Sequence, residues 1–88
     1  MNIREKVTGL MEREVADVFM LDREYIAANH GLKFRQDLVA TSIHYFPIVT
    51  ALEEDLKIDI DFHEFQYESE TIEHAIDFVV MLYNQQNK

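Results

Sequence analysis

The chain has 88 residues, 48% of them apolar, and no linker or repeat, which predicts a single globular domain over residues 1–88. It contains no cysteine, so a disulfide scaffold and a structural cysteine–zinc site are excluded. Seventeen acidic side chains against eight basic ones give a formal charge of −9, which argues against nucleic acid and anionic membranes as partners. A basic protein surface is the partner that this charge favours.

Length and hydropathy indicate where the protein is located and which class of function it has. The longest apolar run, residues 78–83, has six residues, far below the roughly 20 that a membrane-spanning helix needs. The N-terminal residues lack the hydrophobic run of a secretory signal, so we expect a cytoplasmic monomer without membrane insertion. A chain of this size buries only around 60% of its potential surface on folding, which favours a small carrier or binding module over an enzyme.

The first predicted helix begins near residue 3 and extends to residue 19, because apolar side chains recur there at steps of three and four. Asn2 is placed to cap this helix. The pattern weakens over residues 22–36, where Tyr25 and Ile26 predict a short helix within a long connection. The sequence Asn29-His30-Gly31 is expected to end that short helix with a left-handed cap.

A second main helix is indicated by apolar residues between 48 and 56, and it is expected to end near Lys57. Its start depends on Pro47, which has no backbone donor and whose ring clashes with the carbonyl four residues earlier. Pro47 therefore belongs in the first turn of a helix or at a kink, and it pushes Phe46 toward extended geometry. Two starts stay open: the helix begins at Pro47, or it begins at Ser42 and kinks.

The rest of the chain predicts one loop and two helices. Residues 58–62 alternate like a strand, but a single strand has no partner, so we expect a loop that buries Ile58 and Ile60. Residues 65–67 predict a short helix, and residues 72–83 predict a strongly amphipathic last helix begun by Ser69 or Thr71. The predicted fold is therefore all-α, a small helical bundle of three main helices plus one or two short ones.

Few residues indicate catalysis or metal binding. The four histidines lie in separate segments without the spacing that places two ligands on one helix face. The chain has no glycine-rich phosphate loop and no carboxylate pair with an evident pocket, so we expect no catalytic residue, no metal and no enzyme activity. Acidic side chains gather instead in residues 52–77, which hold ten acids and one base.

One serine stands in a pattern that matches a known family. Ser42 follows Asp37-Leu38-Val39-Ala40-Thr41, and nine residues later comes Ala51-Leu52-Glu53-Glu54. In this arrangement the chain resembles the acyl carrier proteins, whose Asp-Ser-Leu motif bears a 4′-phosphopantetheine on the serine and is followed at this spacing by an Ala-Leu-Glu-Glu stretch. Phe34, Asp37, Leu38 and Ala40 match the family's Phe-x-x-Asp-Leu-Gly-Ala approach. The apolar ladders of the first and last helices match as well, so the resemblance covers nearly the whole chain.

The resemblance implies a function and a cofactor. A phosphopantetheinyl transferase would attach 4′-phosphopantetheine from coenzyme A to the Ser42 hydroxyl. The thiol of that arm would then hold an acyl group as a thioester and carry it between acyltransferases or synthases of a specialised lipid, lipopolysaccharide or polyketide route. The absence of cysteine fits this chemistry, because a protein thiolate near the thioester would capture the acyl group.

The resemblance also implies two sets of site residues. The acidic set would dock on basic patches of partner enzymes and consists of Glu53, Glu54, Asp55, Asp59 and Asp61. The apolar set would line a cleft for the acyl chain and equally fills the core; it consists of Phe46, Val49, Leu52, Ile60, Phe65, Ile72 and Ile76.

Four positions depart from the family pattern. Thr41 stands where an aspartate normally precedes the serine, Val39 replaces the loop glycine, and His44 and Pro47 occupy positions that are usually acidic. The attachment end is thus nearly neutral, which leaves a second interpretation open. In that interpretation the chain is a small acidic protein-interaction module with a carrier-like fold and no prosthetic group, and Ser42 only caps a helix.

Overall fold

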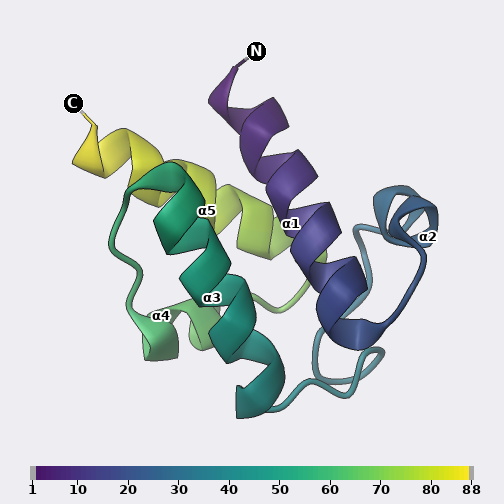
Figure 1. The fold of residues 1–88 in the computed structure, drawn as a ribbon. Coiled ribbons are helices and arrows are strands. Elements are labelled where there is room, and N and C mark those ends of the chain that lie inside the picture. The colour runs from purple at the N-terminus through teal and green to yellow at the C-terminus, as the bar shows by residue number, and fades with distance from the viewer. Residues whose placement is uncertain (1, 88) are drawn as a thin grey trace.

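The computed structural model describes residues 2–87, and within this range it contains five helices and no strand (Figure 1). The helices are α1 (Ile3–Phe19), α2 (Arg23–Ala28), α3 (Ser42–Leu56), α4 (Phe62–Glu68) and α5 (Ile72–Gln86). The predicted all-α bundle of three main helices plus short ones is confirmed. No helix between residues 2 and 87 has the length and apolar character needed to span a membrane.

The long first helix organises the bundle, because it packs against α2, α3 and α5. The Asn2 side chain caps α1 as predicted, accepting a 2.8 Å hydrogen bond from the Glu5 amide. Val7, Met11 and Val15 recur at four-residue steps and are fully buried. The short α4 completes the core by packing against α3 and α5.

The short helix predicted around Tyr25 is confirmed as α2, but its predicted left-handed end is wrong. Asn29, the residue after α2, has a φ of −137°, and no glycine of the described chain has a positive φ. The Asn29 side-chain amide instead donates a 2.8 Å hydrogen bond to the Tyr25 carbonyl. The Asn29 backbone amide donates a second hydrogen bond to the Ile26 carbonyl. These two bonds satisfy the last carbonyls of α2 without a left-handed residue.

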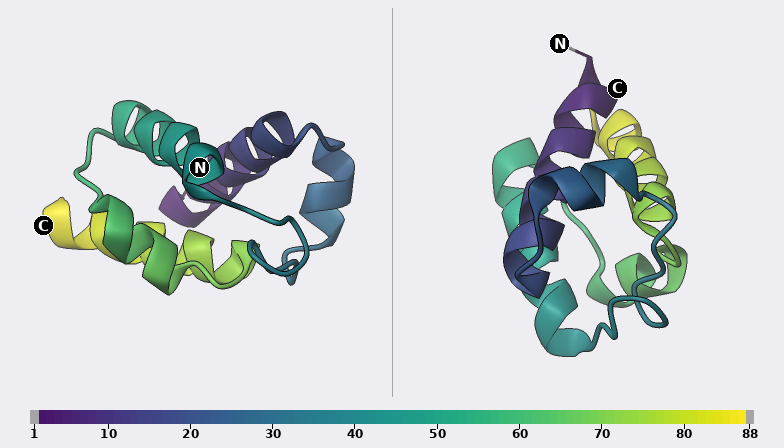
Figure 2. Two further views of the ribbon diagram at one scale, coloured as in Figure 1. Left: turned by 90° about the horizontal axis from the view of Figure 1, so that it is seen from below. Right: turned by 90° about the vertical axis from the view of Figure 1, so that its right-hand side faces the viewer.

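The loop that follows α2 is fixed to the start of α5, beside which it runs in Figure 2. Three backbone hydrogen bonds join the two segments: Phe34 amide to Glu70 carbonyl at 3.0 Å, Ile72 amide to Leu32 carbonyl at 3.2 Å, and Glu73 amide to His30 carbonyl at 3.0 Å. Phe34 is fully buried, and the Asp37 carboxylate accepts a 2.8 Å bond from the Lys33 amide. The chain therefore approaches Ser42 from an anchored loop.

The second half of the chain follows the sequence pattern. Residues 58–61 form an irregular segment, and Ile58 and Ile60 are buried as predicted. Of the two candidates for the start of α5, Thr71 is the cap, because its hydroxyl accepts a 3.0 Å hydrogen bond from the His74 amide. Ser69 ends α4 instead.

One buried hydroxyl in the aromatic core is unsatisfied. The Tyr45 ring lies 5.5 Å from Phe34 and 6.2 Å from Phe65, and its hydroxyl oxygen is buried with no hydrogen-bond partner among the described residues. We expect Tyr45→Phe to stabilise the protein by about 1 kcal/mol, because it removes a desolvated donor while keeping the ring. Urea unfolding of the two proteins measures this difference, and a loss of stability would show that the hydroxyl has a partner.

Candidate functional site

Ser42 is the first residue of α3, and its side chain is exposed. The chain has one other serine, Ser69, which is 2% exposed. The first turn of α3 contains no acidic residue, so no side chain there offsets the partial positive charge that a helix carries at its start. Ser42 is therefore the accessible serine hydroxyl of the described chain, and it lies where a negative group is electrostatically favoured.

The cap of α3 is Thr41, which corrects the interpretation of Ser42 as a cap. The Thr41 backbone amide donates a 2.9 Å hydrogen bond to Nδ1 of His44, three residues later. His44 thus takes the place of the glutamate that accepts this bond in a capping box. The His44 ring stacks on Phe19 with ring centres 4.6 Å apart. The histidine thus closes the start of α3 and ties it to the end of α1, leaving the Ser42 side chain out of the cap.

The two starts that the sequence left open are decided in favour of Ser42. Pro47 lies in the second turn of α3, and Phe46 is helical, so the predicted extended geometry of Phe46 is wrong. Pro47 supplies no amide to the carbonyl of Ile43, and Ile43 is 78% exposed, so this missing hydrogen bond lies at the surface of the domain and not in its core. The capped first turn and the buried residues on either side of Pro47 outweigh the local cost of the proline.

An apolar hollow lies directly beside Ser42. It has a volume of about 450 Å³ and is bordered by Ser42, Ile43, Phe46, Pro47 and Phe62. Phe46 is 64% exposed and its ring centre lies 5.9 Å from that of Phe62 on α4. Large apolar side chains exposed together on a monomer commonly mark an interaction surface, so this hollow is a candidate contact for a partner.

Val39 carries backbone strain three residues before Ser42. Its φ is 54° and the residue is 70% exposed, so a β-branched residue occupies a left-handed conformation while burying little apolar surface. We expect Val39→Gly to stabilise the protein by about 1 kcal/mol. Glycine relieves backbone strain of about 1–3 kcal/mol, but it loses more backbone entropy on folding, which offsets part of the gain. Thermal unfolding checks this, with Val39→Ala as the matched variant that keeps the strain; equal midpoints for the two variants would contradict it.

The seven apolar residues predicted to line an acyl cleft divide into two groups. Six lie in the buried core, between 0% and 7% exposed: Val49, Leu52, Ile60, Phe65, Ile72 and Ile76. Phe46 lies outside the core, on the surface beside Ser42. The helices therefore bring the six together around one interior, while Phe46 belongs to the apolar hollow.

The five acids predicted for docking have unequal structural roles. Three carboxylates already have partners: Glu53 accepts a 2.9 Å bond from the Ile60 amide, Asp55 pairs with Arg13 at 2.9 Å, and Asp61 accepts a 2.8 Å bond from the Glu64 amide. Hydrogen bonds to Glu14 and Asp55 raise the pKa of Arg13 above its ordinary value. Glu54 and Asp59 are exposed and border one surface hollow with Glu53. These two acids are the ones best placed to meet a partner.

The chain was compared with protein families, curated proteins and solved structures. No family model, curated protein or solved structure matches it. The functional interpretation therefore depends on the residues and geometry of this chain.

Sequence reasoning missed the surface role of Ile43 and Phe62. The sequence does contain a signal for the α3 side of the hollow. Ile43 and Phe46 are three residues apart and share a helix face, away from the buried Ile48 and Leu52. Phe62 lies on a different helix, and only the packing of α4 on α3 brings it to this face.

Proposed function

We propose that the protein is an acyl carrier that bears 4′-phosphopantetheine on Ser42. The observation that carries this proposal is the position of Ser42, an exposed hydroxyl on the first residue of α3 with no acid in the first turn. A phosphodiester attached there lies in the favourable field of the helix start. The order of the elements, a long helix, an anchored loop, a helix that starts at Ser42, a short helix and a final long helix, is compatible with the resemblance in sequence.

The chain's own residues supply attachment and presentation in this proposal. Ser42 would provide the nucleophilic oxygen, and a separate transferase would supply coenzyme A and magnesium. When bound, the prosthetic arm supplies the thiol that holds an acyl group. Thr41 and His44 hold the start of α3 in place without using the Ser42 hydroxyl. The proposed carrier works as a cytoplasmic monomer in a specialised lipid, lipopolysaccharide or polyketide route.

The surface around Ser42 favours a partner that contacts apolar side chains at the attachment point. Ile43, Phe46 and Phe62 border the hollow beside the attachment point, and no acid borders it. Glu54 and Asp59, which take part in no ion pair within residues 2–87, lie toward the far end of α3 and in the irregular segment after it. A partner would thus meet apolar side chains at the attachment end and negative charge farther along, where charge mainly sets the rate of encounter.

Neutralising Glu54 and Asp59 is expected to slow docking without unfolding the domain. In the double variant Glu54→Gln/Asp59→Asn, transfer of an acyl or prosthetic group by a basic partner enzyme should fall several-fold at low salt, and its salt dependence should weaken. Stability should change by less than about 0.5 kcal/mol, since neither carboxylate holds the fold.

The matched control removes the same charge from another part of the surface, in Asp22→Asn/Glu24→Gln at the start of α2. Equal transfer rates for the two double variants would contradict docking through Glu54 and Asp59. Glu53→Ala provides a second comparison, because loss of the acceptor for the Ile60 amide should cost about 1–2 kcal/mol of stability.

The proposal is tested by incubating the protein with coenzyme A, magnesium and a panel of phosphopantetheinyl transferases, followed by intact mass spectrometry. A gain of one phosphopantetheine supports it. If every transferase leaves the mass unchanged while modifying its own cognate carrier in the same assay, the proposal fails for that panel and the second interpretation takes precedence.

That second interpretation, an acidic interaction module without a prosthetic group, retains one specific observation in its favour. The apolar hollow of Ile43, Phe46, Pro47 and Phe62 suits a protein partner whether or not Ser42 is modified. The atypical Thr41, His44 and Pro47 also favour it, but the role that it gave to Ser42 is wrong, because Thr41 is the cap.

A further inference from the structure

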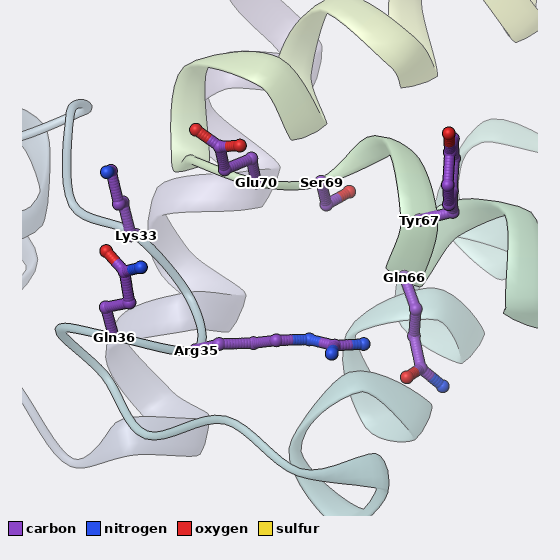
Figure 3. Close-up of a pocket in the computed structure, with 7 residues that line it drawn as sticks. All are labelled: Lys33, Arg35, Gln36, Gln66, Tyr67, Ser69 and Glu70. Carbon is purple, nitrogen blue, oxygen red and sulfur yellow. The ribbon is translucent and has the colours of Figure 1, made fainter.

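A polar cavity lies on another part of the molecule, between the loop before α3 and the C-terminal end of α4 (Figure 3). Its volume is about 330 Å³, at the lower end of the range of about 300–1,000 Å³ found for ligand sites. The lining residues are Lys33, Arg35, Gln36, Gln66, Tyr67, Ser69 and Glu70. The cavity is thus of a size for a small molecule, and each of these lining residues has a polar or charged side chain.

The walls of this cavity are held in place before any ligand arrives. The loop and the segment after α4 are joined by the hydrogen bonds from the Phe34 amide to the Glu70 carbonyl and from the Ile72 amide to the Leu32 carbonyl. Phe34, which lies between the two basic residues of the loop, is fully buried and anchors the loop in the core. A site built on such walls loses little entropy when it binds.

One buried side chain in the cavity wall has an unused hydrogen-bonding group. Ser69 is 2% exposed, and its hydroxyl oxygen has no hydrogen-bond partner among the described residues. Figure 3 shows its side chain on the cavity side of the segment, above the extended side chain of Arg35. Buried hydroxyls are nearly always paired, so this one, in the cavity wall, has no hydrogen bond within residues 2–87 to give up when it donates to a ligand atom.

The charges around the cavity indicate the sign of that ligand. Lys33 and Arg35 take part in no ion pair within residues 2–87, whereas Arg4 and Arg13 do. The Arg35 side chain extends toward the helix that carries Gln66, and the Glu70 carboxylate lies at the opposite end, beside Lys33 (Figure 3). The Gln66 amide lies near the Arg35 guanidinium, and the Ser69 hydroxyl lies above them in Figure 3; all three groups can donate hydrogen bonds to an anionic oxygen.

We infer that this cavity binds a small anion through the Arg35 guanidinium, with the Ser69 hydroxyl and the Gln66 amide as further donors. The ligand class is a carboxylate or a phosphate monoester, since both present oxygens that match the planar fork of an arginine. This site is separate from Ser42, so it stands whether or not the protein is a carrier.

The test is a titration of the ¹⁵N-labelled protein with sodium phosphate and, separately, with sodium acetate, at ionic strength held constant with sodium chloride. Saturable shifts of the backbone amides in residues 33–36 and 66–70 are expected for at least one of the two anions. Saturation by phosphate alone assigns the site to phosphate monoesters, and saturation by acetate alone assigns it to carboxylates. The absence of saturable shifts in these residues with both anions overturns the inference.

Two variants separate binding from a purely structural role. Arg35→Gln should lower the affinity at least about tenfold, because it removes charge-assisted hydrogen bonds. The matched control is Lys57→Gln, an exposed base at the end of α3, which should leave the affinity unchanged. Ser69→Ala should lower the affinity and also raise the thermal midpoint of the free protein, since it removes an unsatisfied buried hydroxyl. Equal affinities for Arg35→Gln and the parent protein would overturn the inference.

Discussion

Ser42→Ala is expected to abolish attachment of phosphopantetheine completely. Alanine has no oxygen to receive the group, and the one other serine, Ser69, is 2% exposed and faces a cavity elsewhere in the fold. The loss should come without unfolding. Because Thr41 and His44 make the cap, alanine at the first position of α3 should change stability by less than about 0.5 kcal/mol.

The matched control for this variant is Ser69→Ala, which removes the other serine hydroxyl and should load as fully as the parent protein. Intact mass after incubation with coenzyme A, magnesium and an active transferase compares the three proteins. Modification that persists in Ser42→Ala would move the attachment to another residue, with the neighbouring exposed hydroxyl of Thr41 as the first to examine.

Phe65→Ala is expected to destabilise the protein by about 3–5 kcal/mol, the range for removing a fully buried phenylalanine. The Phe65 ring is fully buried, with its centre 6.2 Å from Tyr45 on α3 and 6.4 Å from Phe78 on α5. It therefore joins α4 to two of the main helices. Since small domains are stable by only about 5–15 kcal/mol, this change alone consumes much of the total.

The surface phenylalanine Phe46 gives the contrasting result. Phe46→Ala should cost less than about 1 kcal/mol, because the ring is mostly exposed and its main aromatic contact is Phe62. It should nevertheless slow transfer to a partner that uses the apolar hollow. Urea unfolding measures both stabilities, and a loss of similar size in the two variants would contradict the division between core and surface.

The helices that the sequence predicted well are those whose pattern is local. Val7, Met11 and Val15 repeat at helical spacing, and Asn2 caps them with its own side chain, so α1 requires no tertiary information. The same is true of the amphipathic α5, although the sequence left its cap open between Ser69 and Thr71. The end of α2 was predicted wrongly because there are two ways to satisfy the last carbonyls of a helix. Here the side-chain amide of Asn29 bonds to the Tyr25 carbonyl, and no left-handed residue is needed.

The start of α3 could not be predicted, because two local rules conflict with a longer-range contact. Proline disfavours both its own place in the second turn and the helical geometry of Phe46. The structure overrides both through Thr41 and His44, whose ring is also held against Phe19 at the end of α1. Histidine is not a usual member of a capping box, so this pair carries no clear signal in the sequence.

The site was predictable in part. The residues around Ser42 mark it as a candidate, but the sequence does not say which acids are free. The sequence pattern places Glu53 and Asp55 on the exposed face of a helix. Only the fold shows that Glu53 accepts a bond from the Ile60 amide and that Asp55 pairs with Arg13. The polar cavity is invisible to local patterns for the same reason, since residues 33–36 and 66–70 meet only through backbone pairing across the loop.

The intact mass of the protein purified from its native source is the most direct test of the proposed function. An added mass equal to 4′-phosphopantetheine, with or without an acyl group, and located on a peptide containing Ser42, is the predicted result. A native protein whose mass equals that of the unmodified chain would contradict the carrier function and favour an interaction module whose partner contacts the apolar hollow beside Ser42.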